Sequence, residues 1–244
     1  MERLQKVIAN LGYCSRRHAE ELIINNKVKV NGNIVNELGS KVKKGDTIEV
    51  EGTILDNNKN YEYYLLNKPR EVISAASDDK GRKTVVDLIN TNTRIYPIGR
   101  LDYDTTGIIL LTNDGELANL LMHPSSNIDK VYVAKVNGIV TGSDINKLRN
   151  GVIIDGRKTS KAKVKIKSVD KKMGKSIVEL TIHEGRNHQV RKMFEVLGYE
   201  VIKLKREKYA NLDLSKVKVG EYRKLSFKEV TTLYSLCKNK KIKD

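Results

Sequence analysis

A short polar stretch, LDNNKN at residues 55–60, limits the fold more than any other feature of this sequence. Five of its six residues are polar, which is typical of a linker between two folded parts. We therefore divide the 244-residue chain into a small domain at 1–54, a larger domain at 61–236 and a basic tail at 237–244. Hydrophobic residues make up 39% of the chain, which is enough for each domain to bury a core.

The small domain is predicted to be two helices followed by a hairpin. Apolar residues at helical spacing predict a helix over residues 2–10, which ends at Gly12. Ser15 is a suitable N-cap for a second helix that runs to about Asn26. The alternating residues 28–35 enclose an Asn-Gly turn and predict a β-hairpin. The result is a compact helix–helix–hairpin unit.

The larger domain mixes strands with helices. Residue patterning predicts strands at 63–66, 108–111 and 131–136, a long hairpin over 161–182 that turns at 172–174, and helices at 114–122 and 188–197. Residues 84–89 fit either a short helix or a strand.

The positive charge is concentrated late in the chain. Lys and Arg number 46 against 30 Asp and Glu, a net charge of +16, and residues 157–210 alone hold 16 basic and 6 acidic residues. Such an excess attracts polyanions. Lysines at 161, 163, 165 and 167 would share one face of a strand, either as a solvated surface or as a stripe that faces phosphates. Arg16 and Arg17 oppose the dipole at a helix start, so they are better explained as ligand contacts.

Several classes of protein are excluded. Two cysteines are too few for a disulfide framework or a zinc cluster, and no apolar run is long enough to span a membrane. The first ten residues lack the apolar core of a secretory signal, so we expect a cytoplasmic protein. Gly174-Lys175-Ser176 lacks the first glycine of a phosphate loop, and His183 and His188 are misspaced for a helical zinc site.

Two carboxylates, Asp102 and Asp104, lie just before the strand predicted at 108–111. They fit a surface loop of turn-forming aspartates, but loops held by rigid elements are also where catalytic groups concentrate. The pair could bind a metal, as in a metal-dependent RNA nuclease, although no third ligand is evident nearby.

A polar cluster at 183–193 precedes and begins the helix predicted at 188–197. His188 and Arg191 are three residues apart, so they point to one side of that helix. The cluster offers donors for phosphates or base edges, and it equally fits a polar helix start with an exposed arginine.

Four segments in one order resemble the RsuA/RluB family of pseudouridine synthases. They are Gly99-Arg100-Leu101-Asp102, the following TTGIILLTNDGEL, Lys130-Val131-Tyr132-Val133-Ala134, and EGRNHQVRKM ending at Met193. Residues 2–52 resemble the RNA-binding domain shared with ribosomal protein S-four. The resemblance implies an α+β fold, with a mainly antiparallel mixed sheet in the larger domain. Two positions depart from the family: Glu71 and Ala210-Asn211 stand where it usually has glycine and Gly-Pro.

The resemblance implies that a uridine in RNA is isomerised to pseudouridine without a metal or cofactor. Asp102 matches the nucleophile, which attacks either C1′ of the ribose or C6 of the base. Arg191 matches the basic partner that keeps this carboxylate ionised, and Tyr132 matches the tyrosine that stacks on the uracil or relays a proton. The target nucleotide must be flipped out of its stack.

The resemblance also predicts the RNA contacts. The residues expected to hold RNA are Arg100, Arg186 and Lys192 in the larger domain, and Arg3, Lys6, Arg16, Arg17, Lys27 and Lys29 in the small one. We expect a monomer that acts on structured ribosomal RNA or its precursor particle. The segment at 121–125 favours the large-subunit RNA, with the small-subunit RNA as the alternative. A non-catalytic RNA-binding or ribosome-assembly factor is the remaining rival.

Overall fold

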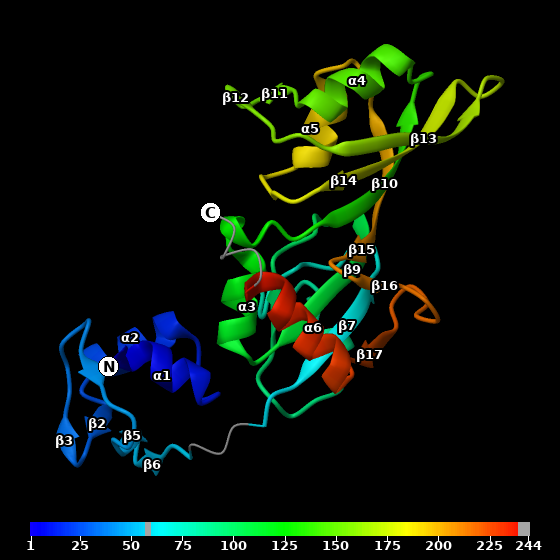
Figure 1. Cartoon of the computed structure of the whole chain (residues 1–244). Coiled ribbons are helices and arrows are strands. Elements are labelled where there is room, and N and C mark those ends of the chain that lie inside the picture. Colours follow the sequence, from blue (N-terminus) through cyan, green and yellow to red (C-terminus); the bar gives the residue numbers. More distant parts are fainter. Residues whose placement is uncertain (57–59, 239–244) are drawn as a thin grey trace. The chain divides into compact units, whose positions relative to one another are not determined.

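The computed structural model describes residues 1–56 and 60–238 (Figure 1). These residues form two compact units. The first holds residues 1–62 with two short segments, 91–95 and 113–115, and the second holds the rest of the chain. The centre of the linker predicted at 55–60, and residues 239–244 of the predicted tail, lie outside the described residues.

The first unit is the expected arrangement of two helices and a hairpin. Its helices are α1 (Leu4–Asn10) and α2 (Arg16–Ile24); its strands are β1 (Glu2–Arg3), β2 (Val28–Val30), β3 (Asn33–Ile34), β4 (Lys41–Val42), β5 (Ile48–Val50) and β6 (Thr53–Ile54). Ser15 caps α2, because its hydroxyl accepts the His18 backbone N–H at 3.1 Å. The helix ends at Ile24, earlier than predicted, because Asn26 adopts a left-handed backbone (φ 58°).

A nine-stranded mixed sheet forms the second unit. Its main order is β13-β14-β10-β15-β9-β7-β17, with β16 beside β15 and β8 beside β9. The bounds are β7 (Tyr63–Lys68), β8 (Tyr96–Ile98), β9 (Thr105–Thr112), β10 (Lys130–Asn137), β13 (Lys163–Asp170), β14 (Lys175–Ile182), β15 (Val201–Tyr209), β16 (Leu212–Asp213) and β17 (Tyr222–Lys224). Neighbouring strands are antiparallel except β9 and β15, which run parallel. The predicted α+β class is confirmed.

The helices of this unit differ from the prediction at several points. They are α3 (Gly115–Met122), α4 (Gly142–Asn150), α5 (Gln189–Glu195) and α6 (Phe227–Lys238). The unit also contains two 3₁₀ turns, η1 (Val86–Leu88) and η2 (Pro124–Ser126). A small hairpin is formed by β11 (Ile153–Ile154) and β12 (Arg157–Lys158). The sequence reasoning missed α4 and α6. A tail beginning at 237 was wrong, because Cys237 is fully buried among the core residues on α3 and β9. None of the described helices is long and apolar enough to cross a lipid bilayer.

The parallel junction between β9 and β15 requires glycine at position 107. A Cβ atom there would lie 2.2 Å from the carbonyl oxygen of Arg206, and Gly107 has a φ of 109°. Gly107 is paired directly with Arg206 in the register of the two strands. The close approach of the backbones therefore fixes where Arg206 stands in the sheet.

The lysine stripe lies on and just before β13, at one edge of the sheet. Lys163, Lys165 and Lys167 are exposed, and two of them share one carboxylate: Lys165 and Lys167 lie 3.0 and 3.4 Å from Glu179. Charged side chains on an edge strand discourage pairing with another chain. The contacts therefore favour the solvated-surface interpretation of the stripe.

Candidate active site

A cavity of about 640 Å³ lies in the second unit, beside the catalytic candidates. Its lining comes from the loop between β8 and β9, from β10 and β15, and from the segment that precedes α5. Asp102 and Tyr132 both line it, as do the expected RNA contacts Arg100 and Arg186. Three segments that are far apart in the sequence thus meet at one cavity.

The loop that carries Asp102 is tied down from inside the protein. Ser74 Oγ donates to the Leu101 carbonyl at 2.8 Å and accepts the Leu101 N–H at 3.0 Å. The fully buried Lys68 donates through Nζ to the carbonyls of Asp102, Tyr103 and Thr105 at 3.1 to 3.3 Å. Burial lowers the pKa of Lys68 to about 8. These bonds fix the backbone of the loop and leave the Asp102 side chain 30% exposed toward the cavity.

The neighbour of the Asp102 carboxylate is a histidine. His188 Nδ1 lies 3.4 Å from Asp102 Oδ2, and His188 is held in a left-handed conformation (φ 52°) as the residue before α5. Among the described residues, Arg191 forms no direct ion pair with Asp102, and its Nη1 donates to the Val201 carbonyl at 3.0 Å. Arg191 thereby ties α5 to β15. Its expected role toward the carboxylate during the reaction stays a prediction.

Arg206 and Lys130 are cavity cations that the sequence reasoning missed. Arg206 is only 3% exposed, and its Nη1 donates to the Tyr132 hydroxyl at 3.3 Å. Lys130 donates to the His183 carbonyl at 3.0 Å, and burial, with a smaller effect of the nearby Arg206 charge, lowers its pKa to about 8. Alternation puts Arg206 on the same face of β15 as Leu204, but the lysines around it give this segment the pattern of an exposed basic strand.

The expected RNA contacts of this unit are not equally available. Arg100 is exposed and lines the cavity. Arg186 is half-buried and donates to the carbonyls of Arg157 and Lys158 at 3.1 and 2.8 Å. Lys192 pairs with Asp155 at 2.6 Å. The last two side chains therefore hold the β11–β12 hairpin against the start of α5.

The expected contacts of the first unit are mostly free of such bonds. Lys6 pairs with Glu2 at 2.7 Å and Lys29 with Glu49 at 2.8 Å. The other four cations are exposed: Arg3, Arg16, Arg17 and Lys27. Four of the six expected contacts are thus exposed cations, and two of these lie in the first turn of α2.

Asp104 has a different environment from Asp102. It lies 3.5 Å from Arg70, its side chain is 57% exposed, and it is absent from the described lining of the cavity. Within residues 1–56 and 60–238, no group of three or more His, Cys, Asp or Glu side chains is arranged to hold a metal ion. The two aspartates therefore do not converge on one site.

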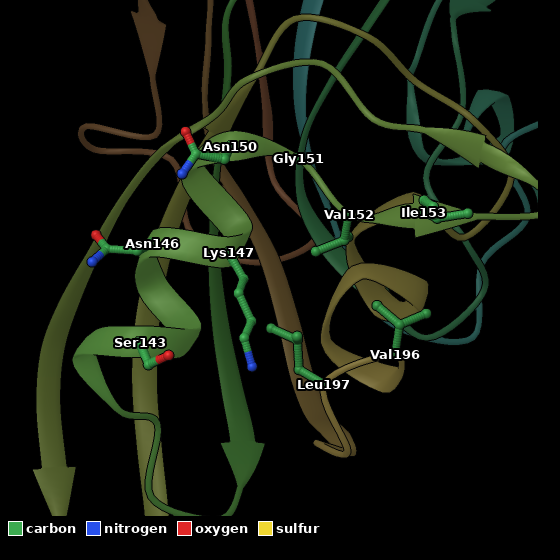
Figure 2. A pocket seen from close by; sticks show the side chains of 9 residues that line it. All are labelled: Ser143, Asn146, Lys147, Asn150, Gly151, Val152, Ile153, Val196 and Leu197. Carbon is green, nitrogen blue, oxygen red and sulfur yellow. The ribbon is translucent and has the colours of Figure 1, made fainter.

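A second cavity, of about 830 Å³, is formed by α4, the residues that follow it and the chain just after α5 (Figure 2). Lys147 is the one charged side chain among its nine described lining residues, which otherwise include exposed apolar residues such as Ile153 and Val196. The nine described lining residues include no carboxylate and no histidine that could activate the Ser143 hydroxyl. The smaller cavity at Asp102 is therefore the candidate active site.

The two departures from the family pattern keep the backbone that glycine would favour. Glu71 has a φ of 62° and Ala210 a φ of 53°, both in the left-handed region. The Glu71 N–H donates to the Tyr103 carbonyl at 2.9 Å, so this turn also supports the loop of Asp102.

Comparison with known proteins identifies the class. The family described as RNA pseudouridylate synthase matches residues 62–196, and the S4 domain matches residues 2–48. The chain belongs to the RNA pseudouridylate synthase family and is an RNA pseudouridine synthase. The resemblance stated from the sequence is thereby confirmed.

Individual relatives cover nearly the whole chain. The ribosomal large subunit pseudouridine synthase B of Bacillus subtilis (strain 168) is 59% identical over 237 residues, 97% of each chain. The dual-specificity RNA pseudouridine synthase RluF of Escherichia coli (strain K12) is 37% identical and covers 97% of this chain and 80% of its own length. A crystal structure of a pseudouridylate synthase is similar with a TM-score of 0.68 and 31% identity, over 96% of this chain and 100% of that one.

Proposed function

We propose that this enzyme converts a uridine of large-subunit ribosomal RNA to pseudouridine, with Asp102 as the nucleophile. The observation that carries the proposal is a carboxylate on a rigid loop, at a cavity that also holds Tyr132. The large-subunit target is supported by the 59% identity to a synthase named for that subunit. Small-subunit RNA is the alternative target.

The reaction needs one ionised carboxylate and keeps the atoms of the nucleoside. An Asp102 oxygen adds to C1′ of the ribose or to C6 of the uracil, and the bond between C1′ and N1 breaks. The base turns and its C5 bonds to C1′, while the bond from Asp102 to C1′ or C6 breaks and frees the carboxylate. The hydrogen at C5 leaves as a proton and N1 gains one, so the mass of the RNA is unchanged.

The target nucleotide reaches Asp102 by leaving its stack. Flipping costs a few kcal/mol, which contacts inside the cavity must offset. Tyr132 supplies a ring for the uracil to stack on, and the exposed Arg100 can hold the phosphate of the flipped nucleotide. Arg186 and Lys192 are weaker candidates for phosphate contact because both already bond within the protein.

The first unit supplies a second contact with structured RNA. Arg3, Arg16, Arg17 and Lys27 are exposed there, and residues 1–54 act as an RNA-binding domain in this proposal. A ribosomal RNA substrate implies work in the cytoplasm.

Release of tritium from RNA labelled at uracil C5 tests the proposal. Wild-type enzyme is expected to release tritium, and Asp102→Asn to lose about a thousandfold or more of the rate while binding RNA within about twofold. Asp104→Asn is the matched control, with normal release. Normal release by Asp102→Asn would refute the assignment of the nucleophile.

The same assay separates the rivals. A non-catalytic assembly factor would bind RNA and release no tritium. A metal-dependent nuclease would shorten the RNA and stop when a chelator is added. A pseudouridine synthase of the proposed kind leaves RNA length unchanged and ignores the chelator.

A further inference from the structure

Arg206 occupies an unusual place for a charged residue. It lies on β15 near the centre of the nine-stranded sheet and is 3% exposed. Its guanidinium carbon lies 5.9 Å from the ring centre of Tyr132 and 5.2 Å from that of Tyr209. Aromatic rings thus surround a cation that also lines the cavity of Asp102.

The hydrogen bonds of Arg206 do not explain its burial. Its Nε donates to the Ile108 carbonyl at 2.7 Å and its Nη1 to the Tyr132 hydroxyl at 3.3 Å. Its Nη2 is buried without a hydrogen-bond partner among the described residues. No described carboxylate lies within ion-pairing distance of the guanidinium. A buried charge without a counter-charge is costly, so a purely structural role would be served better by an apolar side chain.

The bond between Arg206 and Tyr132 has a fixed direction. A guanidinium can only donate, so the Tyr132 hydroxyl oxygen must accept. The proton of that hydroxyl must then point elsewhere, and Tyr132 lines the cavity. We propose that Arg206 is a positioning residue that directs the hydroxyl proton of Tyr132 into the cavity, where the uracil lies. This inference rests on the proposed function.

The backbone supports such a role. In the register of the sheet Arg206 stands between Tyr132 on β10 and Gly107 on β9. A side chain at 107 would collide with the Arg206 backbone, so the strands hold Arg206 at one distance from Tyr132. The hydroxyl is thereby oriented before RNA arrives, which is what preorganised donors require.

A double-mutant cycle tests the proposal, with single-turnover tritium release as the readout. Arg206→Lys is expected to lower the rate about tenfold or more in the wild-type background, but at most about twofold in the Tyr132→Phe background, because the hydroxyl is already gone. The KM for RNA should change by less than about twofold, since the proposed role acts through the Tyr132 hydroxyl and not through RNA binding. Lys205→Gln, on the opposite face of β15, is the matched control with an unchanged rate.

Equal losses in the two backgrounds would overturn the proposal, because they would show that Arg206 acts independently of the hydroxyl. Arg206→Gln repeats the cycle with an uncharged donor, and thermal melting shows which variant is folded at the assay temperature. The same dependence on Tyr132 is expected for it. Tritium release by the wild type and its loss in Asp102→Asn test the proposed function, so the two failures are distinguishable.

Discussion

The two units of this protein use their basic residues in opposite ways. In the first unit Arg3, Arg16, Arg17 and Lys27 are exposed. In the second unit the basic residues near the cavity are largely bonded to the protein: Lys68 and Arg186 to carbonyls, Lys192 to a carboxylate, and Arg206 to Tyr132. The same side-chain types are thus exposed to solvent in one unit and hold loops in the other. The net charge of +16 therefore overstates the positive charge that is available to bind RNA.

The largest loss of stability is expected from a substitution of Lys68, a basic residue that is bonded inside the second unit. Lys68→Met removes the donor for the carbonyls of Asp102, Tyr103 and Thr105. Unsatisfied buried acceptors should lower the free energy of unfolding by about 3 kcal/mol, and tritium release should fall as the loop loosens. Urea unfolding measures the first effect. Lys172→Met, at an exposed turn, is the control, expected within about 0.5 kcal/mol of wild type. Equal stability of the two variants would contradict the prediction.

The buried lysines also give stability a defined pH dependence. Burial lowers the pKa of Lys68 and of Lys130 to about 8, whereas an unfolded lysine ionises near about 10.4. Between these values the unfolded chain holds protons that the folded protein has released, so stability rises with pH. Unfolding in urea from pH 8 to 9.5 should show this rise. In Lys68→Met it should shrink to about half, because Lys130 still contributes.

Intermediate effects are expected from substituting the exposed Arg16 and Arg17 and, separately, the hydrogen-bonded Arg186. Arg16→Gln with Arg17→Gln should lower RNA affinity about tenfold and reduce the salt slope by about two, with stability unchanged. Arg186→Gln should instead lower the free energy of unfolding by about 1 to 2 kcal/mol, through its lost bonds to two carbonyls. RNA binding against salt concentration, together with urea unfolding, gives both quantities. A loss of stability in the Arg16 and Arg17 variant, with a loss of RNA affinity in the Arg186 variant, would contradict this prediction.

The smallest change in stability is expected at Glu71, an exposed residue that supports the loop of Asp102. Glu71 is exposed and left-handed, a conformation that glycine adopts without the clash of a Cβ. Glu71→Gly should raise the free energy of unfolding by about 0.5 to 1 kcal/mol and leave tritium release unchanged. Glu71→Ala is the control and should bring no gain. A loss of stability in the glycine variant would show that the carboxylate of Glu71 matters more than its backbone.

Sequence patterns predicted the fold correctly where the structure of a short segment depends on its own residues. The Ser15 cap, the Asn-Gly turn at 31–32 and the hairpin that turns at 172–174 depend on short-range chemistry, and the structure contains all three. The meeting of Asp102 with Tyr132 at one cavity was predicted through the family resemblance. Periodicity alone does not show which strands become neighbours.

The rest could not be predicted because it depends on burial of charge. In sequence, Arg206 stands among Lys203, Lys205 and Lys208 and looks like part of an exposed basic strand. Only the pairing of β15 with β10 and β9 makes it interior. The hydrogen bond of Arg191 was out of reach for a related reason: spacing places Arg191 on the side of His188, but it cannot show that the guanidinium bonds to the Val201 carbonyl.

The parallel pairing of β9 with β15 has a consequence for how the enzyme matures during translation. Thr105, three residues after Asp102, pairs with Leu204, about a hundred residues later in the chain. The loop of Asp102 therefore cannot be completed until the ribosome has synthesised β15, whereas the first unit closes mainly through local contacts. A nascent chain thus acquires the exposed cations of its first unit well before the cavity at Asp102 is assembled.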